Sequence, residues 1–110
     1  MTEQDTIPIA IAGVSHHTAN VAAIEAFRFT GEAEFLEAAG RRFSAALLLQ
    51  TCNRVEVIVE GDMDTLNEFL AEQGRKGFFV HEGTGALRHL FALASGIDSM
   101  IVGEDQIIGQ

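Results

Sequence analysis

The only cysteine of the chain lies in a short polar stretch between two apolar ones. The segment LLLQTCNRVEVIVEG (47–61) places Cys52 directly after Thr51 and two positions before Arg54. A thiol reacts as its thiolate, and a neighbouring cation favours that form. Cysteines kept for packing alone are among the most buried residues and usually have apolar neighbours. The pattern makes Cys52 a candidate nucleophile, and a buried structural thiol is the alternative.

Four histidines could serve such a thiol as a base. His89 lies beside the apolar stripe of a predicted helix, so its ring could face a cleft or simply lie at the surface. A thiol paired with an imidazole would also suit a Cys/His hydrolase. The roles of His16, His17 and His81 stay open. Because no histidine or cysteine pair has the short spacing of zinc motifs, we expect no metal site.

The apolar periodicity predicts an α+β fold. Strands are expected at 7–14, 44–49, 55–59 and 77–82, and helices at 21–27, 30–40 and 62–74. This order is the split βαβ pattern of ferredoxin-like folds, with a four-stranded antiparallel sheet and its helices on one face. We therefore expect a ferredoxin-like subdomain over 1–82.

The predicted strand at 55–59 has different residue types on its two sides. Val55, Val57 and Val59 fall on one side, and Glu56 and Glu60 on the other. Since successive side chains of a strand point to opposite faces, the pattern predicts one face in the core and one in water.

The spacing of apolar residues changes from strand-like to helical after residue 82. Leu87, Leu90, Phe91 and Ala94 have helical spacing, and Asp98 could cap a further short helix. We predict that 83–110 is a small helical extension of the same domain.

Composition excludes several classes. The formal net charge of −9 argues against general nucleic-acid affinity, which depends on clustered Lys and Arg. No apolar run approaches the ~20 residues of a membrane-spanning helix. A single cysteine cannot form an internal disulfide, and the N-terminal MTEQDTIP has no leader pattern. GTGALR (83–88) lacks the third glycine of a dinucleotide fingerprint. We expect a cytoplasmic protein whose chain has no nucleotide-binding domain.

Four stretches together resemble the N-terminal catalytic domain of glutamyl-tRNA reductases. They are GVSHHTANV (13–21), TCNRVEV (51–57), LRHLFALASGIDSM (87–100) and VGEDQIIGQ (102–110). Their combination and order are more specific than any one of them.

The resemblance implies an NADPH-dependent reduction of glutamyl-tRNA to glutamate-1-semialdehyde in tetrapyrrole (haem) biosynthesis. Cys52 would attack the aminoacyl ester and form a thioester, Arg54 would hold the substrate carboxylate, and His89 would position groups or transfer a proton. Matching polar positions expected around the substrate are Thr51, Asn53, Ser99 and Gln106.

The chain departs from the family pattern at His17, Asn20 and Asp105, where lysine, proline and proline are frequent. The resemblance also implies that the NADPH-binding and dimerisation domains lie beyond residue 110, so this chain alone is not expected to reduce anything. A homodimer would form through those regions, and an aminomutase that receives the semialdehyde is a possible partner. The alternative from another class is a non-catalytic ferredoxin-like interaction module with a buried cysteine.

Overall fold

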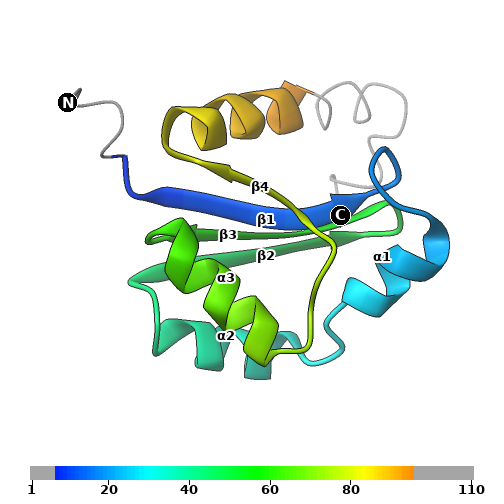
Figure 1. Cartoon of the computed structure of the whole chain (residues 1–110), viewed down its shortest axis with the longest axis horizontal. Helices are drawn as coiled ribbons and strands as arrows, with labels where there is room; N and C mark the ends of the chain where they lie inside the picture. The colour runs from blue at the N-terminus through cyan, green and yellow to red at the C-terminus, as the bar shows by residue number, and fades with distance from the viewer. Residues whose placement is uncertain (1–6, 96–110) are drawn as a thin grey trace, which may run out of the picture.

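A computed structural model describes residues 7–95 of the chain (Figure 1). The labelled elements are β1 (Ile9–Ser15), α1 (Val21–Phe27), α2 (Glu32–Gly40), β2 (Ala45–Thr51), β3 (Arg54–Glu60), α3 (Met63–Glu72) and β4 (Phe79–Glu82). A further helix covers 83–95 within the described part. The helix predicted from Asp98 onward lies outside the described residues.

The four strands form one sheet in the order β2-β3-β1-β4, and all neighbouring strands are antiparallel. This is the order that a ferredoxin-like chain produces, so the predicted α+β class and sheet are confirmed. In Figure 1, α1, α2 and α3 lie on one side of the sheet and the 83–95 helix lies on the other. The proposed division into 1–82 and 83–110 stays a prediction.

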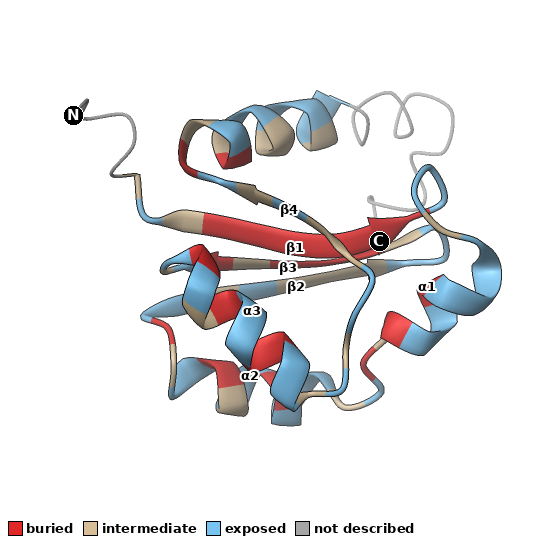
Figure 2. Cartoon of the chain, viewed as in Figure 1, coloured by how far each residue is buried: buried red, intermediate tan, exposed pale blue. Residues whose placement is uncertain are grey.

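The face under α1, α2 and α3 is a hydrocarbon core. Its cross-strand pairs are small β-branched or alanine side chains, such as Ala12 opposite Val57 and Val14 opposite Val55. Larger side chains from the helices cover them, including Phe27, Leu66 and Phe69, which are nearly or fully buried (red in Figure 2). Burying each such large side chain stabilises the fold by roughly 1.5–3 kcal/mol before entropy is counted.

The opposite face of the sheet is also covered around β1 and the middle of β3, which the alternation in β3 did not predict. The 83–95 helix packs on it, and both Ile11 of β1 and Ala86 of the helix are fully buried. The prediction that Glu56 faces water is wrong, because its exposed fraction is 0 %. Glu60, at the end of the strand, is exposed as predicted. A helix that follows in the chain therefore buries the middle of a face that the alternation in β3 assigned to solvent.

Two local signals decide where α3 and β4 begin. Asp62 caps α3 by accepting a hydrogen bond from the Thr65 amide at 2.7 Å, which satisfies a free donor of the first turn. β4 begins at Phe79, two residues later than predicted, because the chain bends at Gly77, whose φ of +70° is not that of extended chain.

Candidate functional site

The turn between β2 and β3 carries the cysteine. Thr51 and Arg54 are the last paired residues, so Cys52 and Asn53 form the whole connection. The Asn53 amide donates to Thr51 Oγ1 at 3.2 Å, and the His16 amide donates to the Asn53 carbonyl at 2.9 Å. Cys52 itself is exposed. This exposure contradicts the buried-thiol alternative and leaves the sulfur reachable from solvent.

The middle of β3 holds a carboxylate that no solvent reaches. One oxygen of Glu56 pairs with Arg54 Nη1 at 2.5 Å, and the other lies 2.7 Å from His89 Nε2. Arginine stays protonated in proteins, so the Arg54 partner is always a cation. A carboxylate only accepts hydrogen bonds, so His89 Nε2 carries the hydrogen and Nδ1 is its second ring nitrogen. Glu56 therefore fixes both side chains from the interior.

Gly13 makes room for this carboxylate. It lies directly opposite Glu56 in the β1–β3 pairing. A Cβ added at position 13 would lie 2.3 Å from the Val55 carbonyl oxygen and 2.9 Å from Glu56 Cγ. Real Cβ atoms do not approach backbone oxygens that closely, so only glycine fits here. Because Gly13 has no side chain, the Glu56 side chain can lie over β1 at this position.

A pocket of about 560 Å³ adjoins the cluster, since Arg54 and His89 both line it. Its other walls are residues 15–18 at the end of β1 and in the following loop, Phe79 and His81 of β4, and Ala92 and Leu93 of the helix. Cys52 is not one of the lining residues. The pocket thus includes Arg54 but not the thiol two residues before it.

Three of the residues that line this pocket, Phe79, His81 and His89, have rings in contact with one another, and the two contacts of Phe79 are tilted. The His81 and His89 rings are stacked with their centroids 4.4 Å apart, and Phe79 lies 5.3 Å from His81 and 5.4 Å from His89. The pKa of His81 is lowered, chiefly by burial and then by the charge of His89, against the opposite influence of Glu56. The two imidazoles therefore disfavour carrying charge at the same time.

The predicted site residues separate into three groups. Thr51, Cys52 and Asn53 share the exposed turn, while Arg54 and His89 meet through Glu56. Ser99 and Gln106 lie outside the described residues.

Glu56 is the site residue that the sequence reasoning missed. The available signal was an acidic side chain in the middle of a valine-rich strand, with a glycine at the corresponding place in a neighbouring strand. Reading that signal requires knowing that β1 and β3 pair in this register.

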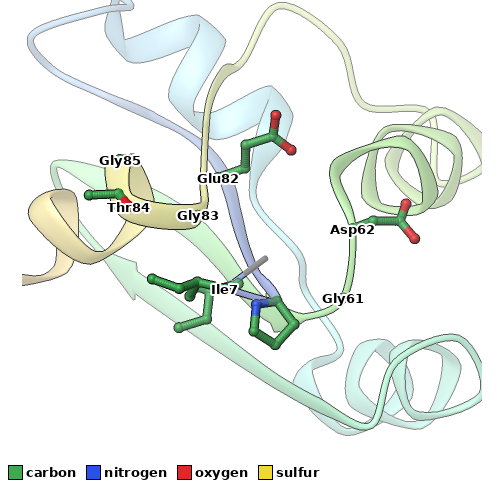
Figure 3. Close-up of a pocket in the computed structure, with 9 residues that line it drawn as sticks. Ile7, Gly61, Asp62, Glu82, Gly83, Thr84 and Gly85 are labelled. Atoms are coloured by element: carbon green, nitrogen blue, oxygen red, sulfur yellow. The ribbon is translucent and has the colours of Figure 1, made fainter. Parts of the chain in front are cut away.

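A second pocket, of about 650 Å³, lies around the start of the 83–95 helix (Figure 3). Residues Gly83, Thr84 and Gly85 line it together with Asp62 and Glu82. None of the predicted site residues belongs to it.

Within residues 7–95, no group of three or more His, Cys, Asp and Glu side chains is placed to hold a metal ion. In the same part of the chain, no helix has the length and apolar character needed to cross a membrane.

Fold and site together define an antiparallel α+β domain with an exposed cysteine on the β2–β3 turn, two residues before an arginine that joins a buried Arg–Glu–His cluster. Comparison with known sequences gives the family. Residues 12–110 match the sequence profile described as "Glutamyl-tRNAGlu reductase, N-terminal domain", and the chain belongs to that family.

Individual relatives agree with this assignment. The chain is 72 % identical over 101 residues to the glutamyl-tRNA reductase of Methanoregula boonei, covering 92 % of this chain and 24 % of that protein. It is 61 % identical over 110 residues to that of Methanoculleus marisnigri, covering 100 % of this chain and 26 % of the relative. The solved glutamyl-tRNA reductase from Methanopyrus kandleri has a TM-score of 0.73 and 37 % identity, over 96 % of this chain and 26 % of that one. The chain thus spans about a quarter of the length of these homologues.

Proposed function

We propose that this chain is the acyl-accepting part of a glutamyl-tRNA reductase, the enzyme that draws glutamate into tetrapyrrole synthesis. The observation that carries the proposal is the exposed Cys52 on a two-residue turn, next to an arginine that shares a buried carboxylate with His89. Membership of the family supports glutamyl-tRNA as the proposed substrate.

In the proposed step, Cys52 Sγ attacks the carbonyl carbon of the aminoacyl ester. A carbon–sulfur bond forms, the bond to the ribose oxygen of the tRNA breaks, and the thiol proton ends on that oxygen. The product is a glutamyl thioester and free tRNA. Covalent capture of this kind divides a difficult reduction into two easier steps.

Arg54 is proposed to bind the free carboxylate of the glutamyl group. Its guanidinium has five N–H donors, and the Nη1 contact with Glu56 leaves others available to the pocket that it lines. His89 is proposed to move the thiol proton through Nδ1, because Nε2 is engaged by Glu56. Thr51 and Asn53 flank the thiol and are proposed to orient the ester. Ser99 and Gln106 remain proposals from the family resemblance.

NADPH would supply the hydride that reduces the thioester to the semialdehyde. The residues at 7–95 do not fit a dinucleotide, because every strand pair in their sheet is antiparallel and the glycine-flanked start of the 83–95 helix shares its pocket with Asp62 and Glu82. We therefore derive no step through NADPH from this chain and propose that a further region of the protein binds it. The aminomutase partner and the homodimer stay predictions.

The acyl-transfer step is tested by mixing the protein with glutamyl-tRNA labelled in the glutamyl group, without NADPH, and quenching in acid. We expect at most one label per chain, removable by hydroxylamine as a thioester is. Because the chain has a single cysteine, Cys52→Ser leaves no other thiol to accept the label. Equal label on the Cys52→Ser protein would overturn the proposal.

The same experiment separates the remaining alternatives. A Cys/His hydrolase would turn over simple esters many times without a reductant, whereas the proposed domain gives one burst and then slow release by water. A non-catalytic interaction module would give no burst at all.

A further inference from the structure

The carbonyl that immediately precedes Cys52 in the chain is held by an arginine outside the cluster described above. Arg28 Nη2 donates to the Thr51 carbonyl oxygen at 2.9 Å. Arg28 is the C-cap of α1, and its Nε also pairs with Glu25 Oε2 of the same helix at 3.2 Å. The side chain is only 23 % exposed. Its guanidinium is therefore fixed on one side by α1 and on the other by the cysteine turn.

The preceding residue of β2, Gln50, is also bonded to the segment between α1 and α2. Gln50 Oε1 accepts from the Phe29 amide at 2.7 Å, and Gln50 Nε2 donates to the Phe29 carbonyl at 3.0 Å. Two adjacent residues of β2, Gln50 and Thr51, are thus bonded to two adjacent residues of the α1–α2 connection, Arg28 and Phe29. These hydrogen bonds tie the C-terminal end of β2 to the α1–α2 connection.

Arg75, which follows α3, anchors the connection in turn. Its Nε donates to the Phe27 carbonyl at 2.8 Å and its Nη2 to the Arg28 carbonyl at 2.7 Å. Its guanidinium carbon also lies 4.0 Å from the centre of the Phe29 ring. Helix α3 therefore supports the residue that holds the cysteine turn.

We propose that Arg28 is a positioning residue for Cys52. The turn has only two residues, so its place is set by what holds its flanks. On the β1 side, the His16 backbone amide donates a hydrogen bond to the Asn53 carbonyl. On the α1 side, Arg28 donates one to the Thr51 carbonyl. The inference rests on the proposed acyl transfer to Cys52. Displacement of a reacting atom by about 1 Å can cost on the order of 100-fold in rate, so a loosened turn has a chemical consequence.

The test uses the full-length protein with Arg28→Met, which removes the donor, and Arg28→Lys, which keeps the charge. The matched control is Arg41→Met, since Arg41 makes an exposed ion pair with Glu37 at 3.4 Å. We expect Arg28→Met to lower the single-turnover rate constant for acyl transfer by about tenfold or more, with the half-saturating glutamyl-tRNA concentration within about threefold. Arg28→Lys should lie between it and the wild type. A fall no larger than that of Arg41→Met would overturn the inference.

A second readout works without any activity. Amide exchange of His16 reports its bond to the Asn53 carbonyl, and exchange of Ile24 reports the start of α1 through its bond to the Asn20 carbonyl. In Arg28→Met, or in Arg28→Lys if the first variant does not fold, His16 should exchange faster while Ile24 stays unchanged. Unchanged exchange at His16 would overturn the positioning role even if acyl transfer is observed. Faster exchange together with no acyl transfer in the wild type would overturn the proposed function instead, and with it the role in catalysis.

Discussion

Helices cover both faces of the sheet at least in part, but the side chains buried on the two faces differ in chemistry. Under α1, α2 and α3 the strands present valine and alanine to phenylalanine and leucine, with no charged group among the core residues. Under the 83–95 helix the same strands present Glu56 to Arg54 and His89. Hydrocarbon burial stabilises the fold without directional contacts, whereas a buried charge requires specific partners. We infer that the first face supplies most of the stability, and that the second face holds the Arg–Glu–His cluster of the site.

The largest expected effect on stability is on the hydrocarbon face. Phe69 is 2 % exposed and its ring lies 5.7 Å from that of Phe35 and 5.8 Å from that of Phe43. Phe69→Ala should lower the free energy of unfolding by about 3–5 kcal/mol, because it removes buried surface and leaves a cavity. Urea unfolding measures the loss. Acyl transfer per folded molecule should stay close to the wild-type value. A large loss of acyl transfer would contradict the different roles inferred for the two faces.

Gly13→Ala tests the face of the sheet that carries Glu56, because the added methyl group would meet the β3 backbone. The new Cβ must displace the β3 backbone or Glu56, so we expect a loss of about 1–3 kcal/mol in the free energy of unfolding and a marked loss of acyl transfer. Gly40→Ala is the matched control, since nothing lies within 4 Å of a Cβ there. Equal stability of the two variants in urea would contradict the close packing of Glu56 against β1.

Acid should weaken the second face through His81. Its pKa in the folded state lies below the ordinary value of about 6.5, chiefly because of burial, so the unfolded chain binds more protons as the pH falls past that value. The His81 contribution to stability is therefore present above about pH 6.5 and is lost as the pH falls toward the folded-state pKa. Thermal unfolding from pH 7.5 to 5.5 should show a steeper decline in the wild type than in His81→Gln. Parallel curves for the two proteins would remove His81 as the cause.

The smallest effect is expected at the surface of the first face. Arg42 pairs with Glu68 at 3.0 Å and Glu72 at 2.8 Å, and both carboxylates are mostly exposed. Arg42→Gln should change the free energy of unfolding by less than about 1 kcal/mol, since solvent screens such pairs. Added salt should shrink the difference further. A loss comparable with that of Phe69→Ala would show that charge, not hydrocarbon, stabilises this side.

Much of the fold was predictable because it depends on local patterns. Alternation located the strands, and Asp62 marked the start of α3. The face of Glu56 was not predictable from β3, since a period of two separates two faces without saying what covers each. The cover is a helix that begins 27 residues later in the chain, at residue 83.

For the candidate site, the exposure of single residues was predictable from the sequence, but the contacts between distant residues were not. The polar neighbours of Cys52 pointed to an exposed thiol, and the structure confirms that exposure. The sequence offered no sign that Arg54 and His89 share one carboxylate, because 33 positions separate His89 from Glu56 and only the packing of the last helix joins them.

The central claim is that buried Glu56 holds Arg54 and His89 in place for chemistry at Cys52. The most direct test is the single-turnover rate of acyl transfer from glutamyl-tRNA to Cys52 in Glu56→Gln, which keeps the shape of the side chain and removes its charge, with retention of the fold checked by circular dichroism. The account predicts that the folded variant transfers the glutamyl group at least about 100-fold more slowly than the wild type, because the amide is neutral and has one acceptor oxygen for two donors, so either Arg54 or His89 faces an NH2 group instead of an acceptor. A folded Glu56→Gln protein that transfers it within about twofold of the wild-type rate would contradict the account.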